Sequence, residues 1–305
     1  MQIMEMARGC NQSFEELPSI DQQLTFSELS IELIRVLGIE QLNRDILKTL
    51  ELYSDQNGFN NAAALLADTN SFKGIDIIRF GNSINEIMER KSLENISILL
   101  QMEQCIQMFH QYYRYEKIEG MDRKSVDKIP ERAFREAVAN ALVHRMWDIP
   151  ASIKISMYSD KIEISSPGGL PAGISEDEYL NGQISLLRNP IIGNVFFRLK
   201  YIEKFGTGIM RINYAYKDAL IKPDYHIFSN SIQIILPVIK SDYKLNETEK
   251  KLLNILKING SMTRNEIEKA AEIDKSKAIR GLNRLIEKKM IQKRDLGRGT
   301  KYEIV

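Results

Sequence analysis

The 305-residue sequence contains only two cysteines, Cys10 and Cys105, which lie far apart. It has no CxxC pair, so the sequence indicates neither a disulfide framework nor a zinc site. The first residues lack the apolar run of a signal peptide, and no apolar stretch approaches the ~18 residues that span a membrane. These absences predict a cytoplasmic protein that is not held in a membrane.

The sequence also lacks a charge excess, because 42 Lys and Arg stand against 41 Asp and Glu, a net charge of +1. Whole-chain electrostatics therefore predict no partner, and any nucleic-acid surface must be local. No GxxxxGK[ST] segment occurs, which argues against a helicase motor. The length predicts two or three domains, and an apolar content of 43% is that of an ordinary globular protein.

Hydrophobic periodicity predicts the elements of the first part of the chain. Two helices are expected within residues 25–53, interrupted at Gly38, and a third over residues 60–68 after the turn Asn57-Gly58. The β-branched segment 75–80 predicts a strand. Residues 93–113 predict a long helix with one apolar side.

Residues 129–145 (IPERAFREAVANALVHR) predict a helix with two distinct faces. Its apolar residues recur at steps of three and four: Phe134, Ala137, Val138, Ala141 and Leu142. Glu136, Asn140 and His144 follow one another at steps of four, so they share one side of the helix. A carboxylate, an amide and an imidazole in this arrangement can share Mg²⁺, water or phosphate. An ordinary polar surface helix would show the same spacing.

The residues after this helix predict a β-hairpin and then a lid. Alternation over residues 152–166 predicts two strands around Ser159-Asp160 with one buried face. The next segment, SPGGLP, excludes helix and mid-strand structure. The polar residues 173–189 predict a loop long enough to be a lid. Helices are expected from Asn189-Pro190 and after Gly206-Thr207-Gly208, and a strand over residues 232–238.

In this order, these features resemble the GHKL ATPase fold that gyrase, the large heat-shock chaperone and histidine kinases share. More closely, REAVANALVHR, ISSPGGLP, LLRNP and EKFGTGIMRI resemble the GHKL-like domain of a family of bacterial transcriptional regulators. In that family the domain follows a Schlafen/AlbA-type domain, and members are often labelled RecG-like helicases. Upstream, GFNNAAALLAD and the long helix resemble the end of a Schlafen/AlbA-type domain, so we expect a shortened form of that domain here.

The resemblance implies roles for individual residues, with ATP and Mg²⁺ as cofactors. Glu136 matches the position that polarises the attacking water, and Asn140 matches the Mg²⁺ ligand that bridges the phosphates. The glycine box, whose amides would hold phosphate, is matched by Gly206, Thr207 and Gly208. The other residues expected at the cofactor-binding site are Ser166, Gly168 and the narrower family's own His144, Arg188 and Asn189.

The sequence departs from the GHKL family at one motif. Nucleotide-binding GHKL proteins carry the pattern DxGxG after the hairpin, and its aspartate recognises the adenine amino group. Ser166, Gly168 and Leu170 stand at the matching positions, so the aspartate and the second glycine are absent. A serine accepts a hydrogen bond but carries no charge and reaches less far. The sequence therefore leaves three alternatives open: a working ATPase, a nucleotide-binding domain without turnover, or a scaffold or dimer module that binds no nucleotide.

After a linker at residues 237–245, the hydrophobic periodicity indicates a separate C-terminal domain. Helices are predicted over residues 247–258, after the cap Thr263 and over residues 275–288, followed by strands at 290–294 and 301–305 around Gly297-Arg298-Gly299. Three helices and a hairpin in this order resemble a winged helix-turn-helix. From residue 261 to 305, twelve Lys and Arg stand against seven Asp and Glu, a local excess of +5.

This excess predicts a DNA-binding surface on the third helix and the wing, although a solvated face or a protein-docking module would share it. The residues expected at DNA are Ser276, Lys277, Arg280, Asn283, Arg284, Lys288 and, in a minor groove, Arg298. Gly281 is expected within the basic face, where it would bring the backbone close to a partner.

Together these patterns predict an α+β protein. It would hold a segment like the end of a Schlafen/AlbA-type domain (1–125), a GHKL (Bergerat)-like α/β sandwich (126–240) and a winged helix-turn-helix (241–305). The predicted function is a DNA-binding transcriptional regulator that acts as a homodimer on double-stranded DNA, with a nucleotide as effector. The alternatives are an ATPase acting in DNA transactions and a docking protein without a ligand.

Overall fold

The computed structural model describes residues 13–120, 122–171, 173–182, 186–203, 207–219, 221–239, 245–288, 290–295 and 300–304. The chain forms two compact units, Met1–Ile239 and Lys240–Val305. The second unit begins where the winged helix was expected. The boundary expected near residue 125 falls inside the first unit, whose central sheet takes strands from both sides of that position.

A six-stranded sheet organises the first unit, in the order β4-β3-β7-β8-β10-β9. The strands are β3 (Ile75–Phe80), β4 (Ile87–Leu93), β7 (Ile153–Met157), β8 (Lys161–Pro167), β9 (Asp224–Phe228) and β10 (Ser231–Pro237). Strands β3 and β7 pair in parallel, and the other neighbours pair antiparallel. Burial alternates along β7, β8 and β10, so one face of the sheet lies against a core.

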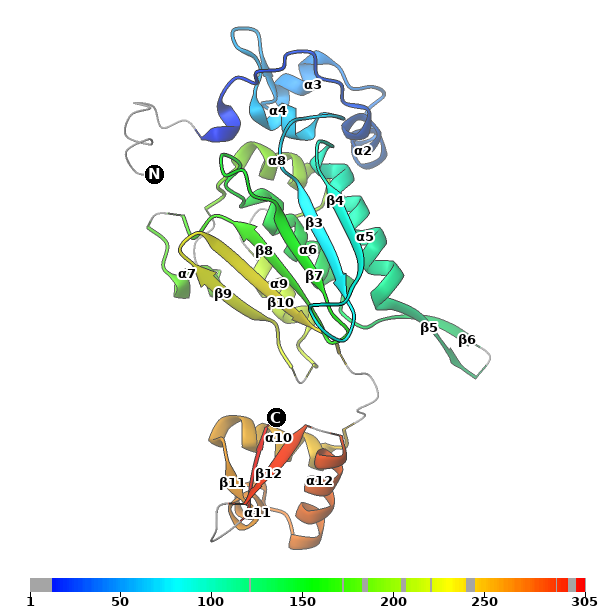
Figure 1. The fold of residues 1–305 in the computed structure, drawn as a ribbon, viewed down its shortest axis with the longest axis vertical. Coiled ribbons are helices and arrows are strands. Elements are labelled where there is room, and N and C mark those ends of the chain that lie inside the picture. Colours follow the sequence, from blue (N-terminus) through cyan, green and yellow to red (C-terminus); the bar gives the residue numbers. More distant parts are fainter. Residues whose placement is uncertain are drawn as a thin grey trace. The chain divides into compact units, whose positions relative to one another are not determined.

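Helices cover that face and complete an α/β sandwich (Figure 1). They are α5 (Ile98–Tyr113), α6 (Glu131–Val143), α8 (Pro190–Arg198) and α9 (Gly208–Ala215). The apolar stripe predicted for α6 is buried in one continuous core that also holds residues of β3, β7, β8 and β10. The helix α5 begins at Ile98, later than the predicted residue 93, because Ser97 accepts a hydrogen bond from Leu99 N–H and caps it.

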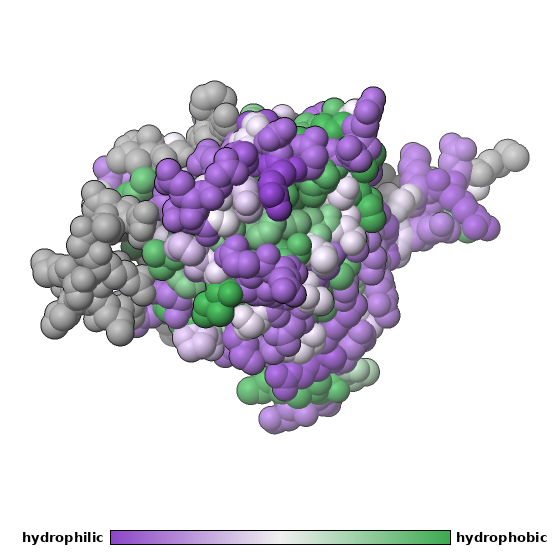
Figure 2. Space-filling model, turned by 90° about the horizontal axis from the view of Figure 1, so that it is seen from above, coloured by the Kyte–Doolittle hydropathy of each residue, from purple (hydrophilic) through white to green (hydrophobic). Residues whose placement is uncertain are grey.

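Smaller elements precede the sheet: η1 (Phe14–Glu16), α2 (Ser27–Leu37), α3 (Arg44–Thr49), β1 (Tyr53–Ser54), β2 (Gly58–Phe59) and α4 (Asn61–Leu66). The fully buried carboxylate of Glu15 accepts hydrogen bonds from Ile191 N–H (2.6 Å) and Ile192 N–H (3.0 Å), so η1 caps the start of α8. Four large hydrophobic residues of this region are exposed: Ile20, Ile31, Ile34 and Leu37. On the face seen from above, hydrophobic residues lie among hydrophilic ones (Figure 2).

Several elements lie where none was predicted. The longest are β4, β9, the hairpin β5 (Arg114–Glu119) and β6 (Asp122–Asp127), and the short helix α7 (Glu176–Leu180). The helix α7 interrupts residues 173–189, which were expected to form an unbroken loop. A capping box starts α7, in which Ser175 and Glu178 satisfy each other's backbone N–H groups. The predicted lid is therefore partly helical.

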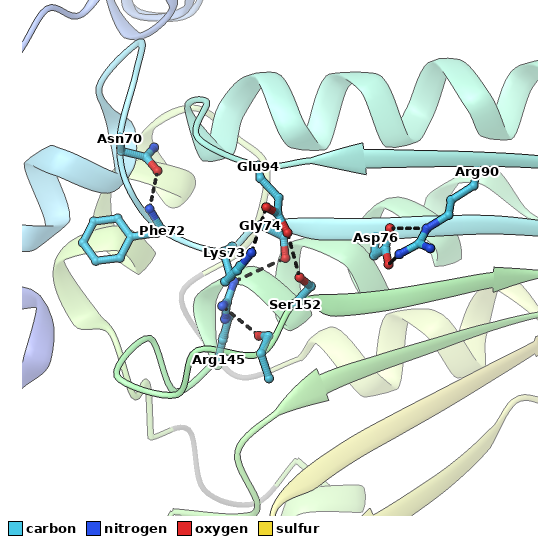
Figure 3. A network of polar contacts seen from close by, with 10 residues as sticks. Asn70, Phe72, Lys73, Gly74, Asp76, Arg90, Glu94, Arg145 and Ser152 are labelled. Carbon is cyan, nitrogen blue, oxygen red and sulfur yellow. Dashed lines mark hydrogen bonds and ion pairs between the residues drawn. The ribbon is translucent and has the colours of Figure 1, made fainter.

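Arg145, one residue beyond the capping residue of α6, joins three elements of the sandwich (Figure 3). The side chain is 1% exposed, and its guanidinium donates to the carbonyl oxygens of Lys73, Gly74 and Ala151. It also lies 4.1 Å from the ring centroid of Trp147. Burial lowers the pKa of Arg145 to about 10. These bonds fix the end of α6 against the starts of β3 and β7.

The second unit contains α10 (Glu247–Asn259), β11 (Met262–Thr263), α11 (Arg264–Ala271), α12 (Lys275–Glu287), β12 (Ile291–Asp295) and β13 (Thr300–Ile304). Its sheet has the order β11-β13-β12, and its own core includes Leu252, Leu256, Ile267, Leu282 and Leu285. Three helices and a two-stranded wing in this order confirm the predicted winged helix. In the part of the chain that the structure describes, no helix is long and apolar enough to cross a membrane.

Candidate functional site

The side chains of Glu136, Asn140 and His144 lie together, as their spacing on α6 predicted. All three line one cavity, and Asn140 and His144 also line a second cavity beside it. The remaining residues of the first cavity are Pro171, Ile174, Tyr179, Leu186, Leu187, Ile202, Glu203, Gly208 and Ile209. The remaining residues of the second are Ala141, Ile164, Ser166, Gly168, Tyr179, Ile232 and Ile234. The polar stripe of α6 therefore faces a site rather than open solvent.

The first turn of α9 packs directly on this stripe. A Cβ at Gly208 would stand 2.6 Å from Asn140 Nδ2 and 2.9 Å from Glu136 Oε1. A side chain at this position would occupy the space beside the amide and the carboxylate and would displace them. Thr207 precedes α9 as its capping residue, so the free N–H groups of the helix start lie next to Asn140. Gly206, the other expected phosphate-binding residue, lies outside the described residues.

Glu136 is a buried carboxylate, with 6% of its surface exposed. Burial raises the pKa of Glu136, while the positive charges of Arg211 and Arg132 oppose the rise. The carboxylate makes no hydrogen bond or ion pair with the residues that the structure describes. A buried carboxylate with a raised pKa and unused oxygens is suited to accept a proton from a water molecule.

His144 follows the last turn of α6 as its C-terminal capping residue. Burial, aided by the charge of Arg188, lowers the pKa of His144 to about 4. The imidazole is therefore neutral at pH 7 and offers one donor and one acceptor nitrogen to the cavities.

Ser166 lies at the second cavity, where its hydroxyl is already engaged. Its Oγ donates to the carbonyl oxygen of Ala141 at 2.8 Å, which ties β8 to α6. The neighbouring walls are the apolar side chains of Ile164, Ile232 and Ile234. No carboxylate lines this cavity within the described ranges, and its polar side chains are those of Asn140, His144, Ser166 and Tyr179.

Gly168 and Arg188 form a mutually dependent pair. Gly168 has a φ of +109°, and a Cβ there would stand 2.1 Å from Arg188 Nη1. Arg188 Nη2 donates to the carbonyl oxygen of Gly169 at 2.7 Å. The glycine therefore makes room for the guanidinium that holds the turn after β8. Arg188 acts electrostatically on His144 but is not among the residues that line either cavity.

Asn189 serves the end of α6 rather than the cavities. It is 2% exposed, and its Nδ2 donates to the carbonyl oxygens of Val143 (2.7 Å) and Arg145 (2.8 Å). These are carbonyls that a helix end leaves without partners. Asn189 thus positions the helix that carries Glu136, and its two amide hydrogens are used in doing so.

Four residues of the site were not predicted from the sequence: Tyr179, Glu203, Arg132 and Arg211. Tyr179 lies on α7 and lines both cavities. Glu203 lines the first cavity, and its Oε1 lies 3.2 Å from Arg211 Nη2. The spacing Ser175–Glu178 was a readable signal for α7. Glu203 and Arg211 lie within the motif EKFGTGIMRI, but the resemblance implied no role for either residue.

The second unit presents the predicted DNA-binding face. Ser276, Lys277, Arg280, Asn283 and Arg284 are exposed on one side of α12, opposite the buried Ala278, Leu282 and Leu285. Arg298 lies outside the described residues.

Lys288 differs from the rest of the expected DNA-binding set. Its Nζ lies 2.8 Å from Oε2 of Glu249, whose side chain is 2% exposed, and Arg284 Nη1 lies 3.8 Å from the other oxygen. The ammonium of Lys288 therefore joins α12 to α10.

The expected role of Gly281 was wrong. Gly281 is buried, and a Cβ there would stand 2.5 Å from Leu252 Cδ1 of α10. The glycine allows α12 to pack closely on α10 and does not lie on the exposed basic face. Its position among basic residues in the sequence gave no sign of this, because residue 281 lies on the helix side that α10 covers.

Comparisons with known proteins find one family match within each unit. Residues 151–236 match the family model described as "Putative ATP-dependent DNA helicase recG C-terminal". This segment holds β7 to β9 and most of β10 but begins after α6, so Glu136, Asn140 and His144 precede it. Residues 239–305 match the family described as "Sugar-specific transcriptional regulator TrmB". The chain therefore carries an ATPase-like domain followed by a TrmB-type winged-helix regulator domain.

Among solved structures, the crystal structure of the DIP2311 protein from Corynebacterium diphtheriae is similar. The TM-score is 0.66, the sequence identity is 18%, and the match covers all of this chain and 66% of that chain. At this identity the likeness shows a shared fold. The comparison with curated proteins finds no match.

Proposed function

We propose that this chain is a cytoplasmic transcriptional regulator whose winged helix binds double-stranded DNA and whose ATPase-like domain binds a nucleotide effector. The observation that carries the proposal is the exposed stripe on α12, in a unit that matches a transcriptional-regulator family. Lys277 and Arg284 would contact phosphates, and Ser276, Arg280 and Asn283 would reach base edges in the major groove. Because such proteins often bind two-fold sites, we propose a homodimer.

The site on α6 supports the nucleotide part of the proposal. The side-chain oxygen of Asn140 is a hard ligand of the kind that Mg²⁺ prefers, and Gly208 leaves open the space beside it and Glu136. These residues fit a Mg²⁺–phosphate group, with Asn140 holding the ion and the α9 amides facing the phosphates. Mg²⁺ would neutralise phosphate charge when bound.

A nucleotide would require the lid to move. The first cavity has a volume of about 60 Å³, whereas pockets for drug-sized ligands occupy ~300–1,000 Å³. Tyr179 of α7 borders both cavities, so outward movement of α7 would join and enlarge them. This movement would couple nucleotide binding to a conformational change, which is what an effector requires.

The second candidate function is ATP hydrolysis in DNA transactions. The buried Glu136, with its raised pKa and unused oxygens, favours it, because such a carboxylate could activate water. Phosphate release from ATP that requires Mg²⁺ and disappears in Glu136→Gln would support this candidate.

DNA binding is tested by measuring affinity for genomic duplexes at several salt concentrations. We expect Lys277→Ala to weaken binding and to reduce the slope of log K against log salt by about 1. Lys257→Ala is the matched control, since it removes an exposed lysine of the same unit from α10. Equal behaviour of the two variants would exclude α12 as the DNA-binding helix.

The effector role is tested by adding ATP and Mg²⁺ to wild type and to Asn140→Ala. We expect the nucleotide to bind wild type and change its DNA affinity, and Asn140→Ala to lose both effects. If wild type bound no ATP and its DNA affinity were the same with and without ATP, the effector role would be rejected and the ATPase-like domain would be a scaffold.

A further inference from the structure

We infer that Glu203 is an internal counter-ion for Arg211, and that the phosphate groups of an incoming ligand displace it and take over Arg211. The inference rests on the proposed nucleotide site. It assigns roles there to two residues of the motif EKFGTGIMRI for which the resemblance implied none. It also makes Glu203 a gate, because the ligand must compete with a carboxylate of the protein.

The geometry places the ion pair at the edge of the first cavity. Arg211 lies in the first turn of α9, where its Nε donates to Thr207 Oγ1 at 3.1 Å. Its Nη2 lies 3.2 Å from Glu203 Oε1. Glu203 lines the cavity together with Glu136 and Gly208. The guanidinium is thus anchored to the start of α9, beside the amides that would face phosphate.

Because both side chains are partly exposed, breaking the Glu203–Arg211 ion pair to bind a phosphate costs little free energy. The Arg211 side chain is 26% exposed and that of Glu203 is 51% exposed. Ion pairs at such exposure contribute little to stability, because water solvates both charges when they separate. Glu203 can therefore turn toward solvent, while Arg211 stays bonded to Thr207.

The charges around Glu136 show why a ligand would favour this exchange. Arg211 and Arg132 act on Glu136 as positive charges, and Glu203 acts on it as a negative charge. The Glu136 carboxylate is itself buried, lines the cavity and has no hydrogen-bond partner among the described residues. A phosphate entering beside Glu136 would meet two carboxylates, and displacement of Glu203 removes one repulsion while providing a bidentate partner.

The experiment measures binding of Mg²⁺-ATP and of tripolyphosphate, which has no base or sugar, by calorimetry. We expect Glu203→Gln to tighten binding of both about two- to fivefold, because the competing charge is gone. We expect Arg211→Gln to weaken both about tenfold, and Arg211→Lys to weaken them less. In the Arg211→Gln background, Glu203→Gln should have no further effect, since the two residues act through one another.

Glu176→Gln is the matched control, because it removes an exposed carboxylate from the lid helix without breaking a described ion pair. Unchanged affinity in Glu203→Gln, or equal gains in Glu203→Gln and Glu176→Gln, would overturn the inference while leaving the nucleotide site standing. Tripolyphosphate binding with the expected variant pattern but without ATP binding would support the exchange and reject the nucleotide. Binding of neither probe would overturn both.

Discussion

At the scale of single residues, the turn after β8 depends on a glycine, Gly168, because a side chain there would not fit. Gly168 combines a positive φ with close contact to the Arg188 guanidinium, and Arg188 in turn bonds the carbonyl of Gly169. A residue with a Cβ would be strained by the backbone and would also push the guanidinium away. The two costs are separable, because Gly173 has a φ of +87° but no atom within 4 Å of a Cβ.

We therefore predict that Gly168→Ala lowers the free energy of unfolding by roughly 2–5 kcal/mol, as backbone strain and overpacking add. Gly173→Ala should cost only the strain, roughly 1–3 kcal/mol. Urea denaturation of both variants measures the difference. Equal losses would show that contact with Arg188 does not matter to the turn.

Capping and pairing residues also explain two departures from the sequence expectations at this scale. Asn189 and Lys288 belong to the expected ligand-binding sets, but each bonds a group within its own unit: helix-end carbonyls for Asn189 and the buried Glu249 for Lys288. An asparagine or lysine in a binding motif looks the same in sequence whether its side chain meets a ligand or a helix end.

At the scale of elements, the packing of α12 on α10 combines a close glycine contact with an ion pair. Gly281 brings the helices together at Leu252, and Lys288 reaches the carboxylate of Glu249. Glu249 also closes the capping box of α10 with Asn246. The helix α12 is thus held by groups on its covered side, and the basic residues of its other side remain exposed.

We predict that Lys288→Ala lowers the stability of residues 240–305 by about 1–3 kcal/mol, because it removes the closest cation from a buried carboxylate. Lys257→Ala, on the exposed side of α10, should change stability by less than about 0.5 kcal/mol. Thermal unfolding of the isolated unit gives both values. Pairing Lys288→Ala with Glu249→Gln should recover part of the loss, and failure to recover any would contradict the ion-pair explanation.

At the scale of the whole molecule, the central sheet contains strands from both sides of the boundary expected near residue 125. Strand β7 pairs in parallel with β3, which lies far upstream, and β3 pairs with β4. Residues of α4, α5 and α6 share one core with the sheet. When residues 75–93 are removed, β7 therefore loses β3, one of its two neighbouring strands, and keeps only β8.

We predict that residues 126–239 alone do not fold cooperatively, whereas residues 13–239 and 240–305 each do. The physical reason is that deleting β3 and β4 exposes the edge of β7 and opens the shared core. Circular dichroism during urea unfolding distinguishes the cases. A cooperative transition for residues 126–239 would show that the upstream strands are dispensable.

Patterned segments account for what could be predicted of the fold. The helices α6 and α12, the β7–β8 hairpin and the winged helix follow from strong periodicity, clear caps and turn residues. The strands β4 and β9 lie at the sheet edges, and of their residues only Leu93 is buried, so neither segment has the apolar content that marks a central strand. The helix α7 is only five residues long, and its polar composition resembles a loop.

By itself, the sequence determined which residues of one helix stand together. Glu136, Asn140 and His144 share a face because the helix repeats every 3.6 residues, and the basic stripe of α12 follows from the same period. Only the tertiary structure decided what lies at those faces: Gly208 packs beside Glu136, the charges of Glu203 and Arg211 act on Glu136, and Glu249 pairs with Lys288. A helical period is a local property of a few consecutive residues, whereas the packing of distant segments depends on the shape of the whole core.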